Sequence, residues 1–198
     1  MSSGRICRAA LAIGALTLGL AAPRADALTY TYGVLLSGSY VPPASFAELT
    51  VTGSGNVYDF SLSAFDLNAL FTTDAFIGSV AVNLSPSGAV LPGIPSVLGG
   101  APVSTSSGGG PTGVWDFRFD LADGQDRLTT NEQVSWRATF EVPVTFVGDQ
   151  FALHVQGLTS GQGESGWYVA QIPEPSTYVM LLAGLGLLGF MMRRRLPR

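Results

Sequence analysis

The sequence predicts an all-β body that closes as an antiparallel β-sandwich or jelly roll of about eight strands. Apolar and polar residues alternate in short runs, which is the period of a half-buried strand. Clusters of Gly, Pro, Ser, Asn and Asp separate the runs and predict turns. A 3.6-residue period is not sustained in the body, so the crossover helices of a parallel sheet are not expected. Packing apolar faces against each other is then the natural closure.

Each predicted strand carries one apolar face. Residues 115–121 show this most clearly, because aromatic and leucine side chains alternate there with Asp and Arg. The run from Asp66 to Phe71 is compatible with one helical turn. The expected strands cover residues 29–36, 47–52, 58–62, 76–84, 115–121, 134–140, 151–156 and 167–169.

One long segment, residues 85–113, interrupts this pattern. It has 29 residues without a charge, and it contains eight Gly, five Pro and six Ser. This composition is unfavourable for strands and helices, and loops of this length are usually functional or disordered. We therefore expect a mobile loop, with a partner-binding flap as the alternative.

The body, residues 28–171, has the length of one domain and a strongly acidic charge balance. Twelve Asp and Glu face three Arg, which gives a formal charge of −9 (3 − 12), and the chain has no lysine. Such a surface repels phosphate backbones, so no nucleic-acid partner is expected. The single cysteine, Cys7, precedes the body, which excludes disulfides and thiolate chemistry from residues 28–171.

The first 27 residues have the organisation of a signal peptide. Arg5 and Arg8 precede an apolar stretch over residues 9–22, and Ala25 and Ala27 provide the small residues of a signal peptidase site. An uncleaved N-terminal anchor is the alternative, although the apolar stretch is short for a membrane span.

The C-terminal segment, residues 172–198, joins three features in a fixed order. The acidic tripeptide Pro173-Glu174-Pro175 comes first, an uncharged apolar run follows, and Arg193, Arg194 and Arg195 stand near the end. The run predicts one transmembrane helix at about residues 177–192. Its 15 uncharged residues from 178 to 192 would span about 22 Å as a helix, which is short for a bilayer core. The arginines predict a cytoplasmic C-terminus and an exported body.

This order of features resembles the PEP-CTERM sorting signal of Gram-negative bacteria. The resemblance implies that an exosortase, a membrane-embedded cysteine protease, recognises the Pro-Glu-Pro region and removes the tail. Residues 151–167 also resemble a segment that precedes such tails in exported proteins. The same tail has been labelled an ice-binding protein C-terminal domain, but the body lacks the regular Thr-x-Thr repeat of an ice-binding surface.

Candidate site residues in the body are few. Asp120, Asp123 and Asp126 crowd one turn and could offer oxygen ligands to calcium, although a type I turn explains the same residues. His154 is the only histidine, and alternation places it on the polar face of its strand. No Gly-x-Ser-x-Gly elbow accompanies it, so an ordinary surface histidine is expected. Trp167 follows a glycine-rich turn and alternates with Val169, so a core position is expected, and a glycan contact is the alternative.

The other two tryptophans, Trp115 and Trp136, lie on the apolar faces of their predicted strands, so we expect them in the core. Carboxylate pairs for glycoside hydrolysis need a defined separation, which no sequence pattern shows here. These residues suggest no catalytic, cofactor or metal site.

Together these features predict a non-enzymatic exported protein. It is expected to cross the inner membrane, be anchored transiently by its C-terminal helix, and reach the cell surface or the exopolysaccharide matrix. Its partners are signal peptidase, an exosortase, the inner membrane and exopolysaccharide. A carbohydrate-binding module of that matrix is the alternative, and a secreted hydrolase is the third possibility.

The position of the signal peptidase site predicts the mature N-terminus. Cleavage after Ala27 leaves Leu28 as the first residue of the exported protein. Edman sequencing or N-terminal peptide mass spectrometry of the exported form checks this. An exported chain that still begins at Met1, or that retains residues 9–22, would contradict the prediction.

Overall fold

The computed structural model describes residues 27–85, 92–111, 115–171 and Leu185. Ten strands form from these residues, with one helical turn, α1 (Leu67–Leu70), and a 3-10 turn at Ser160–Gln162. The strands are β1 (Leu28–Ser37), β2 (Ala47–Ser54), β3 (Val57–Ala64), β4 (Phe76–Ser85), β5 (Ser96–Gly99), β6 (Val103–Ser107), β7 (Phe117–Leu121), β8 (Gln133–Thr139), β9 (Thr145–Gln156) and β10 (Ser165–Gln171).

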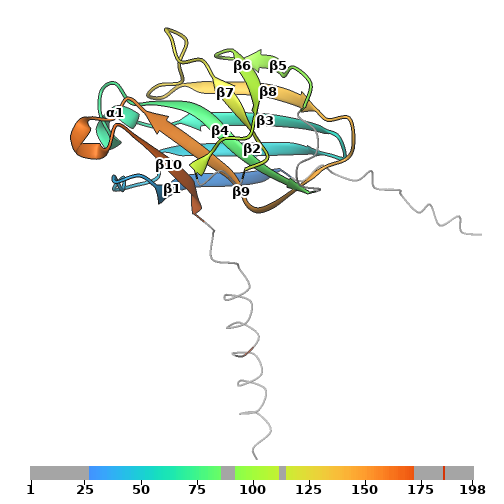
Figure 1. Cartoon of the computed structure of the whole chain (residues 1–198), viewed down its shortest axis with the longest axis horizontal. Coiled ribbons are helices and arrows are strands. Elements are labelled where there is room, and N and C mark those ends of the chain that lie inside the picture. The colour runs from blue at the N-terminus through green and yellow to red at the C-terminus, as the bar shows by residue number, and fades with distance from the viewer. Residues whose placement is uncertain (1–26, 86–91, 112–114, 172–184, 186–198) are drawn as a thin grey trace, which may run out of the picture.

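All ten strands belong to one sheet, in the order β5-β8-β3-β2-β1-β10-β9-β4-β7-β6, and every pairing between them is antiparallel. The two edge strands, β5 and β6, follow each other along the chain with only residues 100–102 between them. The sheet therefore curls until its edges lie close together, as Figure 1 shows. The result is nearly a barrel.

The predicted all-β, antiparallel class is confirmed, but the closure differs from the expected sandwich. A sandwich and a curled sheet both bury every second residue of each strand, so alternation does not distinguish them. Register shifts interrupt the pairing of β1 with β10 and of β4 with β9. Such irregularities bend strands locally and are typical of a sheet that curves strongly.

The eight predicted strands match β1 to β4 and β7 to β10, with ends that differ by a few residues. The helical turn after Asp66 is also present, and the Asp66 carboxylate caps it by accepting the backbone N–H of Ala69 at 3.1 Å.

The expectation of a strandless loop over residues 85–113 is wrong where the structure describes that segment. It contains both edge strands of the sheet, β5 and β6. Edge strands need only one partner, so they tolerate the Gly, Pro and Ser that are unfavourable in a central strand. Val103 and Thr105 pair with Leu121 and Phe119 of β7.

Aromatic residues fill the interior of the curled sheet. Phe60 of β3 and Trp136 of β8 are paired neighbours with stacked rings, 5.2 Å between centroids. Phe119 of β7 lies 5.1 Å from Phe60 and 5.2 Å from Trp136. Because β7 is far from β3 and β8 in the strand order, these contacts cross the interior and join opposite parts of the sheet. Trp136 is thus a core residue, as the sequence predicts.

The targeting segments lie almost wholly outside the described residues. This holds for the signal peptide at residues 1–27, of which Ala27 alone is described, and for the helix at 177–192 apart from Leu185. Among the residues that the structure describes, no helix has the length and apolar character needed to span a bilayer.

Truncating Phe119 should destabilise the protein strongly. Phe119→Ala removes a fully buried ring from between Phe60 and Trp136, so we expect the free energy of unfolding to fall by about 3–5 kcal/mol. Urea denaturation followed by fluorescence measures the change. The control is Ile94→Ala, whose side chain is 94% exposed and should change stability by less than about 0.5 kcal/mol. Equal losses in the two variants would contradict the proposed closure.

Candidate functional site

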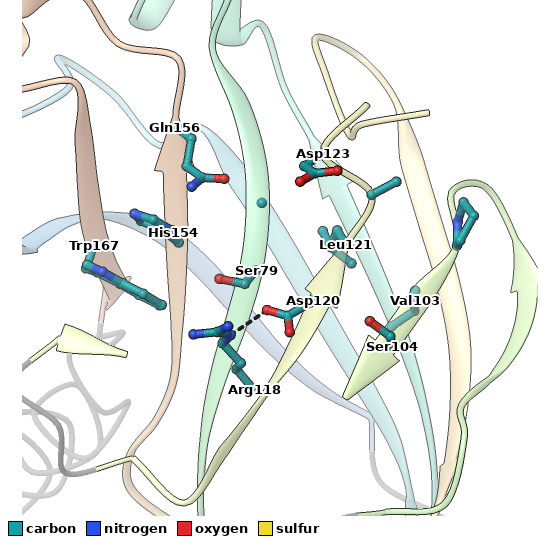
Figure 2. A pocket seen from close by; sticks show the side chains of 13 residues that line it. Ser79, Val103, Ser104, Arg118, Asp120, Leu121, Asp123, His154, Gln156 and Trp167 are labelled. Carbon is teal, nitrogen blue, oxygen red and sulfur yellow. Dashed lines mark hydrogen bonds and ion pairs between the residues drawn. The ribbon is translucent and has the colours of Figure 1, made fainter. Parts of the chain in front are cut away.

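A single row of residues crosses five neighbouring strands on the outer face of the sheet. Trp167 of β10 pairs with His154 of β9, and His154 pairs with Ser79 of β4. Ser79 in turn pairs with Asp120 of β7, which pairs with Ser104 of β6. The register therefore brings together an aromatic pair, a carboxylate and two hydroxyls that are far apart in sequence (Figure 2).

Small residues hollow out the middle of this row. Gly78 and Ser79 of β4 have no long side chains, whereas Trp167, His154, Arg118 and Asp120 stand around them. A cavity of about 600 Å³ results, which is within the usual range for ligand sites. Its lining consists of Gly78, Ser79, Pro102, Val103, Ser104, Arg118, Asp120, Leu121, Ala122, Asp123, His154, Gln156 and Trp167.

His154 and Trp167 form the aromatic wall of this cavity. Their ring centroids are 4.4 Å apart and the ring planes differ by 7°, so the rings are stacked. Trp167 also packs against a small apolar cluster of Ala81, Ala152 and Trp115 on the outer face of the sheet. The indole is therefore packed against these neighbours as well as stacked on His154.

Trp115 is buried, as the sequence predicts, with only 6% of the residue exposed, but it belongs to a second, smaller cluster and not to the main core. Strand β7 begins only at Phe117, so the alternation that would have turned Trp115 inward does not extend to it. Its indole N–H donates to the carbonyl of Pro111 at 3.0 Å. Trp115 instead covers Ala81 and Ala152 from outside, which is why β4 is buried on both faces.

The environment of His154 differs from that of the surface histidine that the sequence predicts. Its side chain is half-buried against Trp167, and burial lowers its pKa from 6.5 to about 4, with a smaller contribution from the positive charge of Arg118. At neutral pH the imidazole is therefore uncharged. Within the described part of the chain it makes no hydrogen bond to a serine or a carboxylate.

The opposite wall of the cavity carries an ion pair. Arg118 Nε lies 2.5 Å from Asp120 Oδ1, and the hydroxyl of Ser106 donates to Asp120 Oδ2. The Arg118 and Asp120 side chains are 37% and 27% exposed, so they hold each other in place while remaining accessible. Charged side chains in such a pair retain spare donor and acceptor positions for a ligand.

Three other polar side chains line the cavity without a partner of their own among the described residues. They are the hydroxyl of Ser79, a residue that is 5% exposed as a whole, the amide of Gln156 and the carboxylate of Asp123. Gln156 lies over Gly78, where a Cβ would come within 2.0 Å of its Oε1. Unpaired donors and acceptors at the floor and rim leave hydrogen-bonding capacity for a ligand.

The three calcium candidates are distributed differently from the sequence expectation. Asp120 is engaged with Arg118 and Ser106, Asp123 is exposed at the cavity rim, and Asp126 lines a second cavity beside Arg127. In the parts of the chain that the structure describes, no three His, Cys, Asp or Glu residues lie together as a metal site would require. The three aspartates of this turn therefore do not form one cluster of carboxylates.

The sequence drew attention to Trp167, His154, Asp120 and Asp123 for separate reasons, but it did not join them in one site. It gave no indication of Ser79, Arg118 and Gln156. The missing information is the pairing of β4 with β9 and β7. One signal was present in the sequence: Gly78, Ser79 and Ala81 are small residues in a strand that otherwise consists mostly of Phe, Ile, Val and Leu. Small residues in a large-residue strand indicate a hollow or a close contact.

Comparison with known proteins identifies the tail. Residues 171–195 match the PEP-CTERM protein-sorting motif. The processing residues Pro173, Glu174 and Pro175 and the arginines at 193–195 fall within this match, outside the described residues. No curated protein and no solved structure matches the chain.

Burial of His154 predicts that the protein loses stability in mild acid. The folded pKa of about 4 lies below the unfolded value near 6.5, so the unfolded chain binds the extra proton. The free energy of unfolding should therefore fall as pH decreases from about 6.5 to 4. The ionisable groups around the ring are Arg118, Asp120 and Asp123.

Urea midpoints at pH 7, 6, 5 and 4.5 test this for the natural protein and for His154→Gln. The variant should lose the decline between pH 6.5 and 4.5, whereas Arg137→Gln, at a distant ion pair with Asp59, should retain it. The same pH dependence in the His154→Gln variant would show that other groups cause it.

Proposed function

Because the chain carries a PEP-CTERM sorting motif, we propose that it is a non-enzymatic component of the cell surface or exopolysaccharide matrix. The motif marks an exported protein that an exosortase processes, with membrane-anchored transit before surface display. The body, residues 28–171, is then the part that remains after both targeting segments are removed.

The boundary between body and tail supports this division. Strand β10 ends at Gln171, and the sorting motif begins at residue 171. Strand β10 is also central, paired on one side with β1 and on the other with β9. Cleavage beyond Gln171 would therefore leave the sheet intact, which is the requirement for a signal that is discarded after sorting.

The chemistry of the body supports a structural or binding role. Its formal charge of −9 (3 − 12) keeps an exported domain soluble, and it has no cysteine to oxidise. In the described residues, the single histidine is stacked on Trp167 and is not aligned with a nucleophile. A hydrolase remains the weaker alternative, and release of reducing ends from a polysaccharide by the purified protein would favour it.

A second candidate function is carbohydrate binding within the matrix. The observation in its favour is the cavity lined by His154, Trp167 and the Arg118–Asp120 pair. Aromatic rings beside planar polar groups are a common way to bind amphipathic ligands. This role is compatible with the sorting account, because a matrix protein needs a means of retention.

Replacing Pro173, Glu174 and Pro175 with three alanines should block processing. Two prolines keep the strip extended, which suits a protease cleft, whereas alanines allow the helix to extend into it. We expect full-length protein to accumulate in the membrane fraction of the native host. Immunoblotting of membrane and extracellular fractions measures the distribution.

The matched control replaces Glu141, Val142 and Pro143 with three alanines. These residues form an exposed strip of the body that also combines an acid with a proline. The control variant should be processed normally. An intact chain ending at Arg198 in the extracellular fraction of the natural strain would contradict exosortase processing.

A further inference from the structure

The outer-face cavity has the form of a site for an extended ligand. Its lining comes from β10, β9, β4, β7 and β6, which are adjacent in the sheet. At the usual spacing of strands, this row extends about 19 Å from end to end. A ligand that fills it would lie across the strands, with the aromatic wall at one end and the ion pair toward the other (Figure 2).

The chemistry of the walls suits a polyhydroxylated ring. His154 and Trp167 cover one face of each other by stacking, and the C–H face of a pyranose can pack against the ring surface that remains. The Ser79 hydroxyl, the Gln156 amide and the Asp123 carboxylate also line the cavity and offer hydrogen-bond donors and acceptors to the hydroxyl groups of such a ring. A compact apolar ligand would leave these polar groups unpaired, which carries a penalty for each.

The charge of the lining favours a neutral ligand. Arg118 is opposed by Asp120 and Asp123, which gives a formal charge of −1 (1 − 2) with His154 neutral. Arg118 is already paired with Asp120 at 2.5 Å, so its positive charge is offset and attracts a carboxylate or phosphate on a ligand less strongly. An anionic polymer would also approach a body of charge −9 (3 − 12), which repels it.

We infer that this cavity binds a neutral polysaccharide chain, with one sugar ring against the His154–Trp167 wall and its hydroxyls bonded to Ser79, Gln156, Asp123 and the Arg118–Asp120 pair. The inference rests on the proposed matrix role. Binding to a polysaccharide is the molecular means by which the exported protein is retained in the matrix. Binding is predicted without cleavage, so no bond in the polymer is broken.

Affinity gel electrophoresis of the exported protein, purified from its own host, tests the inference. Native gels contain one soluble polymer each: the purified exopolysaccharide of the host, dextran, laminarin or galactomannan, with alginate and polygalacturonate as anionic comparators. Retardation by at least one neutral polymer, and none by the two anionic polymers, is expected. Retardation by no neutral polymer, or stronger retardation by the anionic ones, would overturn the inference.

Three variants locate the binding. Trp167→Ala should raise the dissociation constant about tenfold or more, because it removes half of the aromatic wall. Asp123→Ala alters an exposed side chain with no structural partner among the described residues, so it keeps the test valid if the first variant unfolds. Arg118→Gln should weaken binding, because it removes an ion-paired arginine from the cavity wall.

The matched control for Arg118→Gln is Arg137→Gln. Arg137 is also paired with an aspartate, at 2.6 Å from Asp59, but it lies on β8, outside the cavity. It should bind as the natural protein does. Unchanged binding in Trp167→Ala, Asp123→Ala and Arg118→Gln would overturn the assignment of the site. Processing and extracellular location, measured separately, would still stand in that case, so a failure of this inference is distinguishable from a failure of the sorting account.

Discussion

The contact of Phe119 with Phe60 and Trp136 across the interior determines the shape of the molecule. These three rings lie within 5.2 Å of one another although β7 is far from β3 and β8 in the sheet. Aromatic side chains bury large apolar areas, so the sheet gains most by bringing these strands together. A flat ten-stranded sheet would leave each ring partly in water. Curling removes that exposure. It also brings the two edge strands, which follow each other along the chain, close together in space.

The curl also determines what the outer face can do. Strand β4 lies between β9 and β7, and Trp115 covers part of its outer side, so its outward residues are as buried as its inward ones. Only small residues fit under this cover, and where the cover ends they leave a depression. The cavity is therefore a consequence of core closure: the same register that aligns Phe119 inward aligns Asp120 and Arg118 outward beside Ser79.

Much of this architecture could be predicted from the sequence, and the remainder depends on long-range pairing. Period-two alternation located eight strands and the inward position of Trp136, because strand geometry is local. It did not identify the edge strand at Val103–Ser107, where serines dominate, or the outward position of Trp115, where alternation stops before β7. His154 was placed on the correct face, but its stacking on Trp167 arises from the register of β9 with β10, which no local pattern encodes.

Hydrogen–deuterium exchange with mass detection, on the exported protein with and without a neutral polysaccharide that retards it in affinity gels, tests most directly whether this outer-face row is a binding surface. The account predicts slower exchange in peptides that cover Arg118 to Asp123 and His154 to Trp167. Peptides of β8 around Arg137 should exchange at the same rate in both conditions. Protection confined to β8, or equal exchange everywhere at a saturating polysaccharide concentration, would contradict it.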